Sequence, residues 1–120
     1  MYQFSFEKLE VWIEAKDLTK QVYNLTNKFP ENEKFGLTSQ LRRASISICS
    51  NIAEGTSRIT NKDKAHFLSI SFSSTMEVLN QLILSFKLGL ISQEEYTECR
   101  LKISSISNKL NSLRKRILQS

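Results

Sequence analysis

The chain has 120 residues and a formal net charge of +5, with 40% hydrophobic residues, 24% charged residues, three glycines and one proline. A chain of this length buries about two-thirds of its extended surface on folding, so it needs neither a metal nor a disulfide. The scarcity of glycine and proline argues against a sandwich or barrel of many short strands, and the aliphatic content argues against disorder. We therefore expect residues 1–120 to form a single all-α domain.

The start of the sequence, Met1–Lys8, contains no basic segment followed by an apolar run, which argues against a secretory signal. The longest uncharged stretches, such as Ala44–Ala53, are far shorter than the ~20 apolar residues that a membrane-spanning helix requires. We therefore expect a cytoplasmic protein with no membrane partner. A reducing cytosol disfavours a disulfide between Cys49 and Cys99, which we interpret as small buried hydrophobic residues.

The first predicted helix carries one apolar stripe. Its members recur at alternating spacings of four and three residues, which keeps them on one helical face, and they are Val11, Ala15, Leu18, Val22, Leu25 and Phe29. Ser5 is a suitable N-cap, and Pro30 is a suitable stop. The pattern predicts a helix between these two residues.

The second predicted helix extends from Leu37 onward and is apolar on two faces. The core-facing stripe consists of Leu41, Ala44, Ile48 and Ile52. A second apolar stripe beside it consists of Ile46, Cys49 and Ala53. A helix of a monomeric bundle needs only one such stripe, so the second predicts a subunit interface unless this helix lies deep between both neighbours. Gly55 supports a close contact, because glycine within a helix is tolerated where another backbone approaches.

Two segments with the spacing of a capping box, Thr60–Asp63 and Ser92–Glu95, mark the starts of a third and a fourth helix. Gly89 ends the third helix. The apolar stripe of the third helix consists of Ala65, Leu68, Phe72, Thr75, Leu79, Leu82 and Phe86. That of the fourth consists of Tyr96, Cys99, Ile103, Ile106, Leu110, Leu113 and Ile117. These four patterns together predict an up-down antiparallel four-helix bundle.

The serine-rich run Ser69–Ser74 lies inside the third predicted helix rather than in a linker. Its small side chains either allow a close approach between helices or face water.

Five polar residues on one side of the second helix form what we call the polar ladder, namely Arg43, Ser47, Asn51, Glu54 and Arg58. Glu54 and Arg58 have the favourable i, i+4 order for an ion pair, and Asn51 can bond within the ladder. On one interpretation the ladder fixes helix register or subunit geometry. On the other, Arg42, Arg43 or Arg58 contacts a ligand or nucleic acid. Arg42 begins the second apolar stripe, so its charge must reach solvent, pair with an acid or lie at a subunit boundary.

The clearest charge asymmetry lies at the end of the chain, where basic residues occur without any acid. They are Arg100, Lys102, Lys109, Arg114, Lys115 and Arg116. A helix-four stripe of basic and hydroxyl side chains consists of Lys102, Ser105, Lys109, Ser112 and Arg116. Basic groups neutralise phosphates and serine hydroxyls bond to phosphate oxygens, so this stripe predicts contact with a nucleic-acid backbone. An ordinary solvated face is the alternative, and no interleaved aromatic residues are present to stack on bases.

No arrangement typical of an enzyme is present in the sequence. There is a single histidine, His66, and there is no HExxH motif, no cysteine and histidine at ligand spacing and no glycine-rich phosphate loop. We therefore expect no catalytic activity, no metal and no cofactor. For His66 we expect a solvated or capping role.

The sequence resembles that of a known family. The residues that carry the resemblance are Phe29, Pro30, Glu33, Phe35, Gly36, Leu37, Gln40, Leu41, Arg42, Arg43, Ala44, Ser47, Ile48, Asn51, Ile52, Ala53, Glu54, Gly55 and Arg58. Together with weaker matches on either side, they resemble the four-helix-bundle family of 23S ribosomal RNA intervening-sequence proteins over essentially the whole chain. The run Ser69–Ser73 departs from the alanine- and glycine-rich stretch expected at that point.

The resemblance implies a small bacterial bundle that assembles as a ring-like homopentamer. Relatives include accessory proteins of diversity-generating retroelements, which resemble basic pentamers that engage nucleic acid and a reverse transcriptase. Two functions are therefore compatible with the sequence. The first is an oligomeric accessory protein that binds RNA or DNA, and the second is a homo-oligomeric scaffold that binds a protein partner without nucleic acid. An outward-facing helix-four stripe favours the first, and a stripe neutralised by neighbouring acids favours the second.

Overall fold

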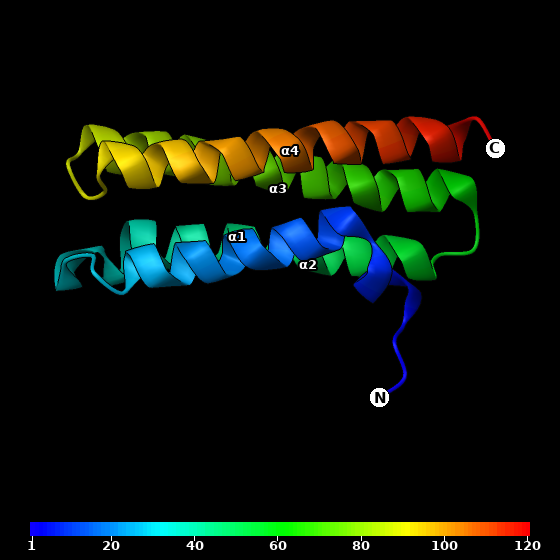
Figure 1. Cartoon of the computed structure of the whole chain (residues 1–120), viewed down its shortest axis with the longest axis horizontal. Helices are drawn as coiled ribbons and strands as arrows, with labels where there is room; N and C mark the ends of the chain where they lie inside the picture. The colour runs from blue at the N-terminus through cyan, green and yellow to red at the C-terminus, as the bar shows by residue number, and fades with distance from the viewer.

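The computed structural model describes residues 1–120, in which four long helices run alternately up and down and no strand occurs. The helices are α1 (Glu10–Thr26), α2 (Ser39–Ser57), α3 (Asn61–Lys87) and α4 (Gln93–Leu118). Three short helical turns complete the chain, namely η1 (Ser5–Lys8), η2 (Glu31–Glu33) and η3 (Lys34–Thr38). Both termini and the turn from α2 to α3 lie at the same end of the bundle (Figure 1). The predicted antiparallel four-helix bundle is confirmed.

The first helix begins later than its sequence pattern predicts. Leu9 has an extended backbone with φ of −73° and ψ of 127°, so the residues from Ser5 to Lys8 form a separate 3₁₀ turn. α1 starts only at Glu10, with Leu9 in the N-cap position. The prediction that Ser5 caps the first helix is therefore wrong, because the chain bends between the η1 turn and α1.

The connection from α1 to α2 also shortens both helices relative to the prediction. α1 ends at Thr26, before Pro30, and the η2 and η3 turns follow. Gly36 has φ of −108° and ψ of −114°, which no helix accommodates, and α2 begins at Ser39 rather than Leu37. The non-helical glycine is the physical reason for the later start.

The starts of α3 and α4 follow the predicted capping residues. At α4, the Ser92 hydroxyl accepts from the Glu95 amide at 3.1 Å and the Glu95 carboxylate accepts from the Ser92 amide at 2.9 Å. At α3, the Thr60 hydroxyl accepts from the Asp63 amide at 3.1 Å. The Asp63 carboxylate pairs with Arg58 instead of returning a bond to Thr60, so only the box at α4 is complete.

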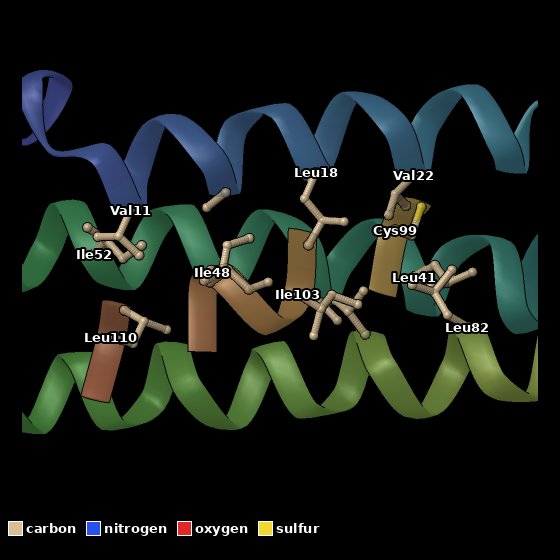
Figure 2. Packing of buried hydrophobic residues seen from close by; sticks show 14 of the residues in the cluster. Val11, Leu18, Val22, Leu41, Ile48, Ile52, Leu82, Cys99, Ile103 and Leu110 are labelled. Carbon is tan, nitrogen blue, oxygen red and sulfur yellow. The ribbon is translucent and has the colours of Figure 1, made fainter. Parts of the chain in front are cut away.

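The core lies between the four helices and consists of aliphatic side chains from each of them (Figure 2). The largest fully buried apolar residues are Leu18, Leu41, Ile48, Ile52, Leu82, Ile103, Ile106 and Leu110. Burial of one such side chain contributes about 1.5–3 kcal/mol to folding. The predicted core stripes of all four helices supply these residues, with Leu82 from the third. None of the helices is long and apolar enough to cross a bilayer.

The seam between α2 and α3 contains small polar residues rather than large aliphatic ones. Its buried members include Ser71 and Ser74 of α3. The Ser71 hydroxyl donates to the Ile48 carbonyl at 2.9 Å, and the hydroxyls of Ser47 and Ser74 lie 2.8 Å apart. Ser71 and Ser74 of the serine-rich run therefore pack against α2, whereas Ser73 is exposed.

Gly55, in the last turn of α2, lies where this helix approaches α3 closely. A Cβ atom on Gly55 would lie 3.2 Å from the Phe67 Cβ and 3.4 Å from the Lys64 carbonyl oxygen. Such distances leave little room for any side chain at this position. The expectation that Gly55 indicates a close approach of another backbone is confirmed.

Candidate nucleic-acid interface

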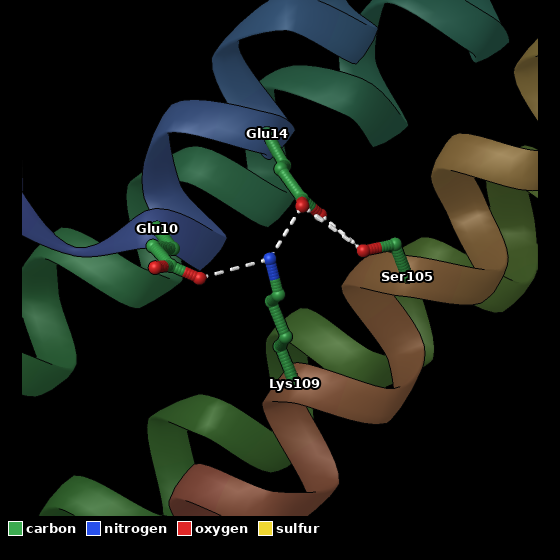
Figure 3. A network of polar contacts seen from close by, with 4 residues as sticks. All are labelled: Glu10, Glu14, Ser105 and Lys109. Atoms are coloured by element: carbon green, nitrogen blue, oxygen red, sulfur yellow. Dashed lines mark hydrogen bonds and ion pairs between the residues drawn. The ribbon is translucent and has the colours of Figure 1, made fainter.

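The centre of the helix-four stripe faces α1 rather than solvent (Figure 3). The Lys109 Nζ atom lies 2.6 Å from Glu14 Oε1 and 3.1 Å from Glu10 Oε2. The Ser105 hydroxyl donates to both carboxylate oxygens of Glu14, at 2.9 and 2.7 Å. The centre of the helix-four stripe, at Ser105 and Lys109, therefore has acidic partners. Two acids of α1 in the same chain neutralise this centre.

These contacts shift the pKa values of both charged partners. Burial alone would raise the pKa of Glu14, but hydrogen bonds from Lys109 and Ser105, with the positive charges nearby, lower it below its ordinary value. Lys102 is half-buried and supplies part of that positive charge. Hydrogen bonds to Glu14 and Glu10 raise the pKa of Lys109. The ion pair is therefore fully charged at neutral pH.

At the other end of the contact between α1 and α4, the positive charge lies on the side of α1 and the negative charge on the side of α4. Here Lys28, just beyond the end of α1, pairs with Glu95 in the first turn of α4. The hydrogen bond from Lys28, followed by that from the Ser92 amide, lowers the pKa of Glu95. We define the α1–α4 seam by Glu10, Glu14 and Lys28 on the side of α1 and by Ser105, Lys109 and Glu95 on the side of α4. Opposite charges face each other at both ends of this seam. Such charge matching favours the observed antiparallel register.

Basic residues from several segments gather at the end of the bundle where α4 finishes, which is the end that carries both termini in Figure 1. The start of the chain, the end of α2, the start of α3 and the last turns of α4 meet there around one pocket. We define the basic end by the cationic residues of these segments, which are Lys8, Arg58, Lys62, Lys64, Arg114, Lys115 and Arg116. Arg58 is the member with a carboxylate at ion-pair distance, the 3.6 Å contact with Asp63.

The opposite end of the bundle, about 45 Å away along its longest dimension, collects acidic residues. They are Glu31, Glu33, Glu94, Glu95 and Glu98. They lie among basic residues, namely Lys28, Lys34, Lys87 and Arg100, so this end has little net charge. The basic end has an excess of positive charge, and a polyanion is therefore attracted to it more strongly.

Sequence reasoning identified Arg58, Arg114, Lys115 and Arg116 as candidate binding residues but did not include Lys8, Lys62 and Lys64. These three lie far from the C-terminal segment in the sequence, and only the antiparallel packing brings them to the same end. The order of the helices is the signal that could have identified Lys62 and Lys64, because an up-down bundle places the turn between its second and third helices beside the end of its fourth helix.

Arg42 ties the start of α2 to the end of α1. Its Nε donates to the Thr26 hydroxyl at 2.8 Å, and its Nη2 donates to Asn27 Oδ1 at 2.9 Å. The guanidinium also lies over the Tyr23 ring, 4.5 Å from its centroid. Neutral acceptors and an aromatic face therefore satisfy Arg42. Arg43 is exposed and bonds within its own helix.

The polar ladder is only partly formed as predicted. The Asn51 side-chain amide donates to the Ser47 carbonyl at 2.9 Å and to its hydroxyl at 3.1 Å. Because Ser47 also meets Ser74, this part of the ladder joins α2 to α3.

The predicted ion pair between Glu54 and Arg58 does not form. Arg58 follows the last residue of α2 and has an extended backbone with ψ of 155°, so it no longer lies one helical turn beyond Glu54. Its guanidinium pairs with Asp63 at 3.6 Å and lies 5.2 Å from the Phe67 ring centroid. Glu54 is exposed.

Arg100 and Lys102 lie away from the basic end. Arg100 is exposed and donates to the Tyr96 hydroxyl one turn earlier in α4. Lys102 lies near the α1–α4 seam, where its positive charge helps to lower the pKa of Glu14. The nine predicted binding residues thus separate into several surfaces.

The second apolar stripe of α2 is partly covered by α1. Cys49 is half-buried, with its sulfur 3.5 Å from the Thr19 hydroxyl. Ile46 remains 44% exposed, and Phe35 in the preceding turn is 88% exposed. Together with Tyr23, these two apolar side chains line an open groove of about 500 Å³. Packing against α1 therefore accounts for Cys49 but not for Ile46, for which a subunit interface stays a prediction.

Reactive side chains are few in the rest of the molecule. Burial, reinforced by the negative charges of Glu98 and Glu95, raises the pKa of Cys99 to about 11. Burial also raises the pKa of Cys49, so both thiols are protonated at neutral pH. His66 is exposed on α3, and no cluster of histidine, cysteine or acidic residues is arranged to hold a metal.

Comparisons with known proteins agree with this architecture. The sequence profile of the 23S rRNA-intervening sequence protein family matches residues 7–112. A crystal structure of a protein of unknown function from the S23 ribosomal protein family of Bacteroides thetaiotaomicron is similar, with a TM-score of 0.81 and 24% sequence identity. The similarity covers 88% of this chain and 98% of that chain, and at this identity it supports the fold. No curated protein matches the sequence.

Proposed function

This chain belongs to the 23S rRNA-intervening sequence protein family, and we propose that it is a non-enzymatic bacterial accessory protein that binds a nucleic-acid backbone in the cytoplasm. The observation that carries the proposal is the basic end, where cationic side chains from separate parts of the chain meet. Most of them lack a carboxylate partner, and Lys115 and Arg116 are exposed.

The chemistry of the basic end suits phosphates better than bases. Lysine and arginine neutralise phosphate charge and release counterions, which supplies affinity without sequence information. Arginine also binds phosphate oxygens with two parallel hydrogen bonds. The Phe67 ring near this end is covered by Arg58, so it is not open for stacking. We therefore expect weak binding of RNA or DNA with little sequence preference.

Assembly of several chains would multiply this surface. The exposed Phe35 and Ile46 side chains and the groove beside them provide apolar surface for a second subunit. The homopentamer implied by the family resemblance would present five basic ends to one polyanion. Linked copies bind with higher apparent affinity than a single copy, because each further contact is intramolecular.

Salt-dependent fluorescence anisotropy with labelled RNA and DNA tests the proposal. We expect binding near 50 mM salt that weakens steeply toward about 200 mM. The triple variant Arg114→Gln, Lys115→Gln and Arg116→Gln should lower affinity and reduce the log-log salt slope by about 3. A matched control with the same charge loss elsewhere, Lys16→Gln, Lys20→Gln and Lys87→Gln, should retain most of the slope.

Two results would overturn this proposal. One is the absence of binding near 50 mM salt for the parent protein. The other is an equal loss of affinity in the two triple variants, which would mean that net charge alone governs binding.

The second candidate function is a homo-oligomeric scaffold that binds a protein partner without nucleic acid. The neutralisation of Lys109 by Glu10 and Glu14 favours it, as does the exposed groove containing Phe35 and Ile46. Light scattering of the parent and of Ile46→Glu tests assembly through this groove. An oligomer that Ile46→Glu dissociates, together with a failure to bind RNA or DNA, would select the scaffold.

A further inference from the structure

An open groove of about 510 Å³ lies beside the Lys109 ion pair, between the start of α1 and the second half of α4. Three cationic side chains line it, namely Lys8 from η1 and Lys109 and Arg116 from α4. The hydroxyl-bearing Ser112 lies between the last two in the sequence and lines the same groove. Glu10 is the one acid among the lining residues, so the groove carries an excess of positive charge.

The two carboxylates that contact Lys109 are held very differently (Figure 3). The Glu14 side chain is only 20% exposed, and it accepts hydrogen bonds from both Lys109 and Ser105. The Glu10 side chain is 81% exposed, and its single polar contact is the 3.1 Å approach to Lys109. Exposed ion pairs of this kind contribute little to stability, because water competes for both charges. Glu14 is therefore fixed in the seam, whereas Glu10 is displaceable.

The other two cations of the groove have no carboxylate partner. Lys8 and Arg116 are both exposed, and neither takes part in an ion pair. Both also belong to the basic end. The groove is thus a lateral continuation of that surface along α4, with a loosely held carboxylate at the point where it reaches Lys109.

We propose that this groove is a subsite for one phosphodiester of a nucleic-acid backbone, and that the Glu10 carboxylate occupies it as an internal competitor in the free protein. A phosphate placed there would receive charge and hydrogen bonds from Lys8, Lys109 and Arg116, and a hydroxyl bond from Ser112. Lys109 would keep its contact with Glu14 and exchange only Glu10. The inference rests on the proposed function, because it identifies the path of the strand away from the basic end.

The competitor can be removed without removing a cation. Glu10→Gln keeps the length of the side chain but abolishes its charge, and the remaining Glu14 contact should preserve the fold. Glu77→Gln is a matched control, because Glu77 is an exposed acid in the middle of α3 and the net charge changes equally. We expect Glu10→Gln to tighten RNA binding about threefold or more relative to this control at the same salt concentration.

A double-mutant cycle tests whether the gain arises in the groove. Lys8→Gln should weaken RNA binding more in the Glu10→Gln background than in the parent, because in the parent the Glu10 carboxylate competes with phosphate for the groove. Equal affinities for Glu10→Gln and Glu77→Gln, or additive effects of Lys8→Gln and Glu10→Gln, would overturn the inference. If the parent protein still binds RNA in that case, the proposed function stands without the groove.

Tripolyphosphate serves as a second probe that does not depend on nucleic-acid binding. In amide NMR spectra, it should perturb Ser112 and Arg116 at lower concentration in Glu10→Gln than in the parent or in Glu77→Gln. This result, combined with no binding of RNA or DNA by any variant, would retain the anion groove and reject the proposed function. Equal perturbation in all three proteins would contradict the groove itself. Thermal melting of each variant verifies that it is folded.

Discussion

The α2–α3 seam and the α1–α4 seam close the same bundle with different side chains. Between α2 and α3, buried serines and a glycine bring the helices close together, and the Ser71 hydroxyl bonds to the Ile48 carbonyl. Between α1 and α4, partly exposed charges such as Glu14 and Lys109 meet across the helices. The α2–α3 seam therefore depends on close packing of small side chains, whereas the α1–α4 seam depends on charge.

This difference indicates which seam can accept a changed contact without loss of the fold. A tightly packed seam of small residues tolerates neither added volume nor displacement, because protein interiors have few voids. A charged seam near solvent can exchange one counter-charge for another at small cost. The basic end and its groove adjoin the charged seam, so the surface that we propose for polyanions lies where exchange is easiest.

The largest effect should come from adding volume to the α2–α3 seam. Ser71→Leu removes a buried hydrogen bond and forces a larger side chain between the helices, and it should lower the free energy of unfolding by about 1–3 kcal/mol or more. Ser73→Leu, on the exposed side of the same helix, should change it by less than about 0.5 kcal/mol. Urea denaturation measures both. Similar losses in the two variants would show that the seam is not tightly packed.

Removing the central charge of the α1–α4 seam should have a smaller effect that depends on salt. Glu14→Gln leaves Lys109 without its main partner, and we expect the melting temperature to fall by about 4 °C at low salt. High salt should narrow the difference between this variant and the parent, since screening weakens charge interactions. The difference in melting temperature between Ser71→Leu and the parent should not change with salt. If salt does not change the difference in melting temperature between Glu14→Gln and the parent, charge does not stabilise this seam.

The two seams should also differ in their response to acid. The pKa of Glu14 is lower in the folded protein than its ordinary value of 4.5, so the ionised carboxylate favours folding. Its contribution is present above that value and is lost as the pH falls below it through the lowered pKa. The parent and Ser71→Leu should therefore share this acid-dependent loss, whereas Glu14→Gln should show less of it. Melting temperatures measured from neutral to acidic pH test this, and parallel curves for all three proteins would argue against it.

The smallest effect is expected at the exposed end of the charged seam. The Lys28 side chain is 64% exposed and that of Glu95 is 29% exposed. Because solvent screens this pair, Lys28→Ala should lower the free energy of unfolding by less than about 1 kcal/mol. Lys34→Ala, at an exposed lysine that also lies outside the four long helices and forms no ion pair, is the control in urea denaturation. A larger loss in Lys28→Ala would mean that charge matching at this end contributes more than exposure indicates.

The fold could be predicted from the sequence because its signals are local. The four-and-three spacing of apolar residues such as Leu18 and Ile48 specifies the core-facing side of each helix, and Ser92 with Glu95 specifies a helix start. The positions at which the predicted helices are interrupted were harder to predict. The bend at Leu9 has no residue signature, because leucine is equally suited to continuing a helix.

The candidate site was predicted only in part, because long charged side chains find partners that the spacing within one helix does not reveal. Arg58 was assigned to Glu54 by helical spacing, but the chain leaves the helix at that residue and Asp63 becomes its partner. Lys62 and Lys64 were missed, since nothing in their own segment connects them with Arg116.

The sequence by itself determined that this protein has four amphipathic helices, a net positive charge and the residues of a known family, because periodicity, composition and motif are properties of order along the chain. The tertiary structure decided which positive charges remain available. Lys109 is neutralised because the packing places α1 with Glu14 against it, and the basic end exists because antiparallel helices bring distant segments together. Charge acts through space, so its effect depends on register and neighbours that only the folded chain defines.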